Sequence, residues 1–312
     1  MTITPTLSRR SFVASAAASS LVASTAYSAA PKLGASQTLH SRFVLGDFEI
    51  TTLMAGSGVR DEPQGIFGMN VSAEEFASVS AENNIPSDSF VNGFTPTIVN
   101  TGSELVLFDT GLPGEMPGIL KTLEAAGYTA DQVDVVVITH MHPDHIGGLM
   151  TAGAPTFPNA RYVTGQVEYD FWSGMEAGNR VGDMVKSNVT PMAEKMSFVA
   201  GGDAPVSGIT AMEQFGHTPG HMGYMIESGG KSVYIAADLA NHYVWSLAYP
   251  DWEVRFDADK AGAAAARRKV LGMLAADGVP IIGYHLPFPA VGYVSTRGDG
   301  FEYTAASYQL KL

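Results

Sequence analysis

Four side chains able to bind a metal stand within six residues of this 312-residue chain. They are His140, His142, Asp144 and His145, in the segment HMHPDHIGG that begins at position 140. Imidazole nitrogen and carboxylate oxygen suit zinc, and also iron, manganese or cobalt. A lone histidine is more often a satisfied polar residue of a core or turn. Four candidates at this density predict a metal site.

A short apolar run, DVVVIT at residues 134–139, comes directly before this cluster. Its β-branched residues and its length favour a buried strand over a helix. Pro143 would end the strand, and Gly147 and Gly148 would let the backbone turn tightly. The metal-binding residues therefore begin where a strand ends.

The spacing within the cluster suggests two metal positions. On an extended backbone, residues two apart point the same way, so His140 and His142 are expected to converge on one ion. Asp144 and His145 would then face a second position nearby. The chain has no cysteine, so no thiolate narrows the choice of metal, and disulfides and cysteine nucleophiles are excluded.

Three more candidate ligands each follow a predicted buried strand, and they are His217, Asp238 and His285. The strands that precede them are expected at residues 209–214, 232–237 and 279–284. Taken singly, each residue is more often a turn or capping residue. Their shared position after a strand favours ligands, because a layered fold brings strand ends together.

The bulk composition is that of a globular protein with a strongly acidic balance. Hydrophobic residues make up 46% of the chain, and the formal net charge is -13. An acidic surface argues against nucleic acid and anionic membranes as partners. It mildly favours neutral or cationic substrates.

Residues 1–30 are typical of a twin-arginine export signal. Arg9 and Arg10 precede a weakly apolar run to about Ala26 and a small-residue stretch at 28–30. This order of regions predicts export, with a disordered tail as the alternative. The run is too short and too rich in serine to span a bilayer. We therefore expect one domain over residues 31–312, located in the periplasm or secreted.

The remaining pattern alternates strands and helices without an internal linker. Strands are expected at 42–45, 48–53, 94–100, 104–108, 134–139, 161–163, 209–214, 223–227, 232–237, 279–284 and 292–295. Helices are expected from Ser72 and at 116–126, 166–172 and 259–276. Residues 174–196 are polar and suit a mobile lid rather than core. One compact α/β domain with two sheets and outer helices is the simplest account.

The order and spacing of the seven candidate ligands resemble the metallo-β-lactamase superfamily of hydrolases. The turn that begins at Asp109 resembles an aspartate turn upstream in that family, and the resemblance runs from about Phe94 to His285. It implies an αββα four-layer sandwich with two divalent metal ions, for which zinc is the expected pair. Asp109 would orient a ligand histidine through its ring N–H.

The resemblance also assigns the ligands. By position, the first ion would be held by His140, His142 and His217, and the second by Asp144, His145 and His285. Asp238 would bridge both ions.

Such a pair of ions implies a hydrolytic mechanism. Two divalent ions lower the pKa of a bridging water, so that hydroxide attacks a carbonyl or phosphoryl group that one ion polarises. Asp144 would handle the proton of that water, and with Asp238 it is the expected catalytic residue. The lack of a cysteine ligand separates this site from the classical antibiotic-degrading zinc enzymes.

Four short segments look closest to the subgroup that holds methyl parathion hydrolase and the N-acyl homoserine lactone lactonases, and they are residues 157–160, 170–172, 217–221 and 285–289. That subgroup hydrolyses lactones, aryl esters or organophosphate triesters. Trp172 matches an aromatic residue of its leaving-group pocket, with a plain core position as the alternative. Phe288 and Tyr243 are weaker pocket candidates.

We therefore expect a small neutral lactone or ester as substrate, and foremost N-acyl homoserine lactones, which would make the protein a quorum-quenching enzyme. The first alternative is hydrolysis of organophosphate triesters or aryl esters. The second is a non-catalytic periplasmic metal-binding protein. No nucleic acid or membrane partner is expected, and a homodimer is expected from the subgroup alone.

Overall fold

The computed structural model describes residues 30–114 and 118–307. The chain divides into two compact units, residues 1–37 and residues 38–312, and every described helix and strand lies in the second. The export signal predicted at residues 1–30 falls almost entirely outside the described residues. No helix in the described ranges has the length and apolar character needed to cross a membrane.

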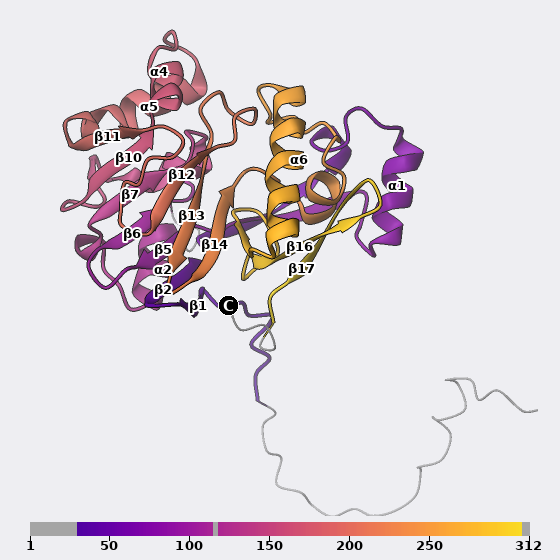
Figure 1. Cartoon of the computed structure of the whole chain (residues 1–312), viewed down its shortest axis with the longest axis horizontal. Coiled ribbons are helices and arrows are strands. Elements are labelled where there is room, and N and C mark those ends of the chain that lie inside the picture. The colour runs from indigo at the N-terminus through magenta and orange to yellow at the C-terminus, as the bar shows by residue number, and fades with distance from the viewer. Residues whose placement is uncertain (1–29, 115–117, 308–312) are drawn as a thin grey trace, which may run out of the picture. The chain divides into compact units, whose positions relative to one another are not determined.

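The second unit holds two mixed sheets that pack face to face, with helices on both outer faces (Figure 1). The first sheet has the order β1 (His40–Leu45), β2 (Phe48–Leu53), β5 (Thr97–Asn100), β6 (Leu105–Phe108), β7 (Val135–Ile138), β10 (Arg161–Gly165) and β11 (Met196–Val199). The second has the order β12 (Ile209–Glu213), β13 (Met222–Ser228), β14 (Lys231–Ala237), β15 (Ile281–Gly283), β16 (Val291–Arg297) and β17 (Gly300–Ala305). The predicted αββα sandwich is confirmed.

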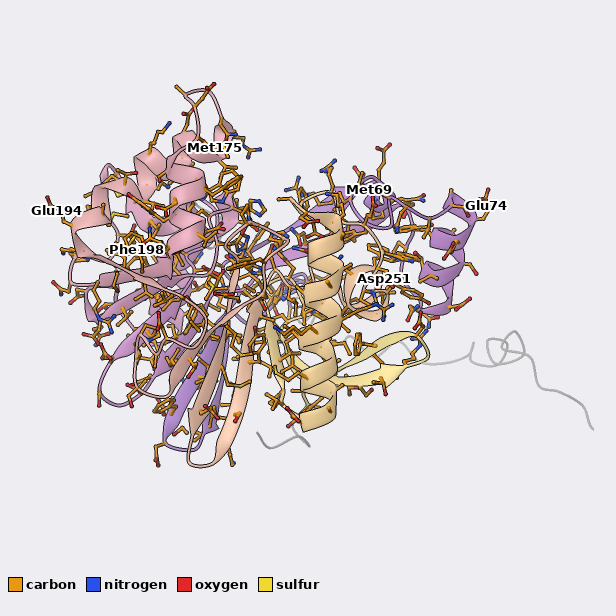
Figure 2. The ribbon with its side chains drawn as sticks, turned by 45° about the horizontal axis from the view of Figure 1, so that its top comes forward. Met69, Glu74, Met175, Glu194, Phe198 and Asp251 are labelled. Atoms are coloured by element: carbon orange, nitrogen blue, oxygen red, sulfur yellow. The ribbon has the colours of Figure 1, made fainter. Side chains whose placement is uncertain are left out.

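Six α-helices are described, and they are α1 (Ala73–Glu82), α2 (Gly118–Ala125), α3 (Pro143–Ile146), α4 (Gln166–Ser173), α5 (Arg180–Asn188) and α6 (Lys260–Asp277). Side chains of α2, α4 and α5 share a core cluster with the first sheet, and those of α6 share one with the second. Figure 2 shows Met175 and Phe198 on the side of α4 and α5, and Glu74 of α1 on the opposite side. Single turns of 3-10 helix lie at Pro63–Gly65, Ala130–Gln132 and Gly147–Leu149, with a longer one at Thr190–Lys195.

The continuous apolar run of β7 follows from burial on both faces. Val135 and Val137 point into the core between the sheets, whereas Val136 and Ile138 point toward the outer helices. All four side chains are buried. A central parallel strand has no solvent face, so its sequence does not alternate between apolar and polar residues.

Parallel pairing places the functional strand ends together. In the first sheet β6 runs parallel to β7, and in the second β14 runs parallel to β15. Parallel neighbours end at the same edge of their sheet, so the residues that follow these four strands gather at one end of the sandwich.

Two predictions about local structure were wrong. Residues 174–196 are not a mobile lid outside the core, because α5 and the turns after it bury Val185, Val189 and Met192 under the first sheet. The strand expected at 94–100 is interrupted, because Pro96 separates β5 from β4 (Ser89–Phe94), which pairs instead with β3 (Gly56–Asp61). Two-residue strands β8 (Met150–Thr151) and β9 (Ala154–Pro155) form a further small pair.

Close packing against neighbouring backbone, rather than a turn with unusual dihedral angles, requires the two glycines after the histidine cluster. A Cβ on Gly148 would lie 2.2 Å from the carbonyl oxygen of Thr110, and one on Gly147 would lie 2.4 Å from Cδ of Pro113. Gly147 has an ordinary helical φ of -65°. The turning freedom expected of these residues is therefore not what requires glycine here.

His242 is a buried histidine that supports an aromatic cluster, defined here as Phe67, Phe76, Trp245 and Trp252. Its ring stacks on Trp245 at 4.0 Å between centroids, and its Nδ1 accepts the backbone N–H groups of Val244 and Trp245. These contacts begin the π-helix Tyr243–Ala248. Burial lowers the pKa of His242 to about 3.

Gly148→Ala is expected to destabilise the fold by about 1–3 kcal/mol, because backbone atoms leave no room for a Cβ. Gly272→Ala is the control. That glycine lies inside α6 with open space around it, so alanine should stabilise by about 0.5–1 kcal/mol. Urea unfolding of the metal-free proteins measures both changes. Equal midpoints for the two variants would contradict the packing argument.

His242 should make the fold sensitive to acid. Its folded pKa of about 3 lies below the ordinary 6.5, so between these values the unfolded chain binds a proton that the folded chain does not. Its contribution is complete above pH 6.5 and declines as the pH falls, by at most about 1.4 kcal/mol per pH unit. His242→Asn keeps an acceptor without titrating, so its free energy of unfolding should fall less steeply between pH 7.5 and 5. Parallel pH profiles for the two proteins would refute this role.

Candidate metal centre and active site

The seven predicted ligand residues lie together at one end of the sandwich. His140 and His142 follow β7, His217 follows β12, Asp238 follows β14, His285 follows β15, and α3 supplies Asp144 and His145. Their ligand atoms form two groups, each with all atoms within 4.8 Å of one another. One group is His140, His142, His217 and Asp238, and the other is Asp144, His145 and His285.

Asp238 contacts both groups through its two carboxylate oxygens. Oδ2 lies 3.3 Å from Nε2 of His217 and 3.2 Å from Nε2 of His285, and Oδ1 lies 3.1 Å from Nε2 of His145. Burial raises the pKa of Asp238, but the surrounding imidazoles outweigh it and hold that pKa well below its usual range. The carboxylate is therefore ionised and placed between the two groups.

The donor set fits a pair of divalent metal ions. Nε2 of His145 and Oδ1 of Asp238 are buried and 3.1 Å apart, but neither makes a hydrogen bond of acceptable geometry, to the other or to any other described group. A buried polar atom without a partner is costly, and a cation between the two groups would satisfy both. Five imidazoles and two carboxylates are the ligands expected for zinc and related ions.

The histidines differ in their charge state. Burial and neighbouring histidines hold the pKa of His140 and His142 well below its usual range, so these rings are neutral with a lone pair available. For His217 burial opposes protonation, but hydrogen bonds to Asp238 and Asp257 raise its pKa to about 9. The buried carboxylates thus attract positive charge to this end of the sandwich.

Asp109 lies where the sequence placed it, behind a ligand histidine. Its Oδ2 is 2.8 Å from Nδ1 of His145, and Thr139 donates its backbone N–H to Oδ1 and its hydroxyl to Oδ2. Asp109 takes a left-handed φ of 60° directly after β6. With Nδ1 engaged by the carboxylate, Nε2 of His145 faces the metal position.

A buried pair that the sequence did not reveal supports His217. Oδ1 of Asp257 lies 2.9 Å from Nδ1 of His217, and Arg267 donates Nη1 to Oδ2 of Asp257 at 2.8 Å. All three side chains are buried. The only sequence signal was an arginine inside the alanine-rich helix α6, and nothing indicated the direction in which it points.

Glu168 is a second missed residue, and it joins the two ligand-bearing loops. Its carboxylate accepts hydrogen bonds from Met141 N–H, Trp172 Nε1–H, the Thr218 hydroxyl and Gly220 N–H, at 2.7–2.9 Å. Met141 lies between two ligand histidines, and Thr218 directly follows a third. Burial raises the pKa of Glu168, and the four hydrogen bonds oppose that rise.

A cavity of about 390 Å³ opens onto the metal-binding residues. His142, Asp144, Asp238 and His285 line it, together with residues from β3, β4, α5 and the loops before and after the π-helix. Asn241 also lines it and donates Nδ2 to Oδ2 of Asp238 at 2.7 Å. The sequence gave no signal for this asparagine.

The three predicted pocket residues do not line this cavity. Trp172 is buried in the core under the first sheet, where its indole N–H is held by Glu168. Tyr243 packs between two apolar clusters and against the His242 ring. Phe288 is half-buried in the turn before β16. The sequence placed these residues near the site but could not give the direction of each ring.

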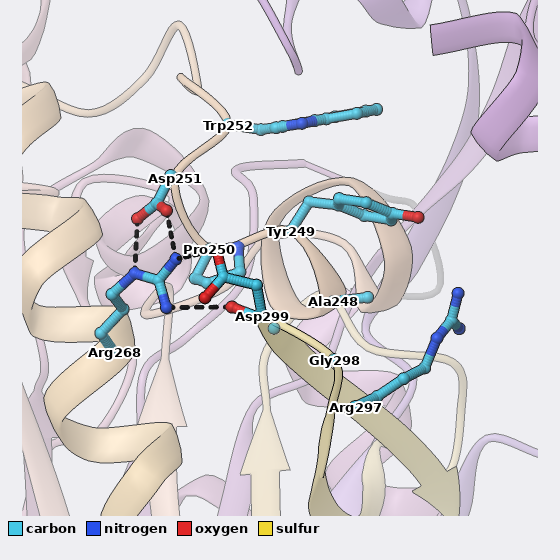
Figure 3. Close-up of a pocket in the computed structure, with 10 residues that line it drawn as sticks. Ala248, Tyr249, Pro250, Asp251, Trp252, Arg268, Arg297, Gly298 and Asp299 are labelled. Atoms are coloured by element: carbon cyan, nitrogen blue, oxygen red, sulfur yellow. Dashed lines mark hydrogen bonds and ion pairs between the residues drawn. The ribbon is translucent and has the colours of Figure 1, made fainter. Parts of the chain in front are cut away.

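A second cavity, of about 400 Å³, is lined by none of the seven candidate ligands. Figure 3 shows Arg268 held by Asp251 and Asp299 at its edge, with Arg297 extending from the far side. Arg268, one of the two arginines that line this cavity, is thus already paired with carboxylates.

Comparison with known proteins agrees with this geometry. Residues 95–280 match the family model described as "Metallo-beta-lactamase superfamily". An "Uncharacterized protein YobT" from Bacillus subtilis (strain 168) is 26% identical over 137 residues, which are 43% of this chain and 57% of that protein. An "N-acyl homoserine lactonase" from Bacillus sp is 28% identical over 110 residues, 35% of this chain and 39% of that protein. The chain thus matches less than two thirds of either relative.

Solved structures extend the likeness to nearly the whole chain. AidC, described as a dizinc quorum-quenching lactonase in complex with a product, superposes with a TM-score of 0.80 at 26% identity and covers 87% of this chain and 99% of its own. The hydrolase AbOPH superposes with a TM-score of 0.79 at 23% identity, over 88% of this chain and 99% of its own. The second likeness shows the fold alone.

Asp257→Asn should weaken metal retention at the His217 position by about 10–100-fold, because the ring loses the carboxylate that orients it. Competition with a chelator of known affinity, followed by metal analysis, measures the loss. Asp251→Asn is the matched control, since that aspartate pairs with Arg268 on the surface and contacts no candidate ligand. Equal retention in both variants would remove Asp257 from the support of the site.

Proposed function

The chain belongs to the metallo-beta-lactamase superfamily of metal-dependent hydrolases, and we propose that it opens lactone rings, with N-acyl homoserine lactones as its foremost substrates. We further propose zinc as the metal pair and export by the twin-arginine pathway as the route to its place of action. The proposal on metal is supported by the imidazole and carboxylate donor set.

The observation that carries the proposal is the position of Asp238. One carboxylate touches imidazoles of both metal-binding groups, and it lies at the wall of a cavity large enough for a small ester. Two divalent ions bound here would make water a nucleophile near neutral pH and would polarise the carbonyl of the lactone. The fold needs no serine or cysteine nucleophile for this reaction.

Asp144 is the residue placed to move a proton. It is half-buried on the cavity wall, with Oδ2 3.4 Å from Nε2 of His285 and 3.8 Å from Nε2 of His145. The hydroxyl of Tyr284 donates to the main-chain oxygen of Asp144 at 2.5 Å and fixes the backbone there. In the proposed reaction Asp144 accepts a proton from the attacking water and returns it to the alkoxide that leaves as the ring opens.

Lactones are favoured over other esters by two of the similar proteins. AidC is described as a lactonase, and the Bacillus sp relative is named an N-acyl homoserine lactonase. Phosphotriester and aryl ester hydrolysis would use the same centre, so these compounds belong in the same assay.

The test is a kinetic panel on protein loaded with metal, containing acyl homoserine lactones, a simple lactone, an aryl ester and an organophosphate triester. We expect the highest kcat/KM on an acyl homoserine lactone and loss of turnover after chelation. Asp238→Ala should lower kcat/KM by at least about a hundredfold and release metal, because it removes the contact shared by both groups.

Asp277→Ala, at the exposed end of α6, is the control and should turn over like the wild type. Protein that holds about two metals per chain, as a two-metal mechanism requires, yet cleaves none of these compounds would instead be a non-catalytic metal-binding protein.

A further inference from the structure

Three arginines line the same cavity as the metal-binding residues. Arg60, Arg180 and Arg255 come from separate parts of the chain and are all exposed at the cavity. The whole chain has 18 lysines and arginines against 31 aspartates and glutamates. The three arginines at this cavity therefore contrast with the acidic balance of the chain as a whole.

The pairing of β3 with β4 explains how Arg60 reaches the cavity. Phe90, Asn92 and Phe94 of β4 all line the cavity, as alternate residues on one face of a strand should. The residues opposite them on β3 are Arg60, Gly58 and Gly56, in that order. Since the two glycines have no side chain, β3 places no side chain of its own between Arg60 and the position opposite Phe94.

The same strands show how far along the sheet Arg60 lies from the metal-binding residue His285. The ring of Phe94 lies 5.7 Å from that of His285, and the carbonyl oxygen of Gly93 lies 2.7 Å from His285 Nδ1. From Phe94 to Phe90, which pairs with Arg60, the strand advances about 13 Å. A group bound by Arg60 would thus be remote from the bond that is cleaved.

The other two arginines also line the cavity without an ion pair of their own in the described residues. Arg180 is the first residue of α5, where a positive charge is unfavourable for the helix itself. The guanidinium of Arg255 lies 5.1 Å over the ring of Phe256, which also lines the cavity. A guanidinium stacked in this way keeps the N–H groups of its edge free for a ligand.

None of the three guanidinium groups lies within 4.0 Å of a carboxylate in the described part of the chain, although Arg161, Arg267 and Arg268 each do. The acidic residues that line the cavity are Asp144 and Asp238, which belong to the metal centre. The three arginines therefore line the cavity without a carboxylate partner among the described residues.

We propose that the preferred lactone carries an oxyacid anion on its acyl group, with a carboxylate as its simplest form, which Arg60, Arg180 and Arg255 bind at a distance from the scissile ester. Arginine forms strong paired hydrogen bonds to such a group. This inference rests on the proposed function for the nature of the scissile bond. It replaces the neutral or cationic substrate expected from the net charge.

The test compares two lactones that differ in one group, N-(3-carboxypropanoyl)homoserine lactone and its terminal carboxamide. The wild type should prefer the carboxylate by about tenfold or more in kcat/KM, mainly through KM. Each of Arg60→Gln, Arg180→Gln and Arg255→Gln should lower that preference about three- to tenfold, and the triple variant should lower it to the preference that the metal ions alone produce. The metal ions also attract a carboxylate, but the variants leave that attraction in place.

Arg297→Gln is the matched control, since it removes the same charge from an exposed arginine outside this cavity. It should keep the full preference. A wild type that opens both lactones equally well, or a control that loses as much preference as the cavity variants, overturns the anion site and leaves the lactonase proposal standing.

Direct binding separates the two proposals when no lactone is opened. Calorimetric titration of glutarate into metal-loaded protein should show affinity about tenfold or more weaker in the triple variant. Weaker glutarate binding by the triple variant, together with no hydrolysis of any lactone, would refute the lactonase proposal and support the anion site. Equal affinity of the wild type and the triple variant for glutarate would refute the anion site.

Discussion

The constraint on which the rest of the structure depends is the crowding of buried carboxylates and imidazoles around Asp238. Its two oxygens meet histidines that follow β12 and β15 and one that lies in α3. Such a cluster is tolerable only if every charge and every ring nitrogen has a partner. The sandwich supplies the geometry because parallel strand pairs in both sheets end at one edge, so short loops bring the ligands together.

Three of the five ligand histidines are each supported by a different acceptor. The Nδ1 atoms of His145, His217 and His285 lie against Asp109, Asp257 and the Gly93 carbonyl respectively. Each contact fixes a ring so that Nε2 faces the metal position. Glu168 then ties the loop of the first histidines to the loop of His217 through four hydrogen bonds. The site is therefore organised by the protein itself, which is what binding two ions at fixed positions requires.

The sequence predicts the parts of this site that depend on strand ends, and it misses those that depend on how elements cross. The ligand residues follow buried apolar runs, and that pattern is visible without a structure. Asp257 and Glu168 have no such pattern, because each is an ordinary acidic residue until the fold brings a distant loop to it. Trp172 shows the opposite case. Its ring lies 6.0 Å from that of His142, but it belongs to the core cluster under the first sheet and does not line the cavity, and a helix position alone does not give that direction.

The residues that line the cavity show why the net charge of the whole chain does not predict the charge of its substrate. A net charge of -13 predicts repulsion of anions, yet ions of the solvent screen exposed charges beyond about 8 Å at physiological salt. Inside the cavity a ligand therefore responds to the groups that line it, and these include three arginines without carboxylate partners. The acidic surface governs solubility and the approach of macromolecules. The local arginines and the metal ions govern which small molecule stays.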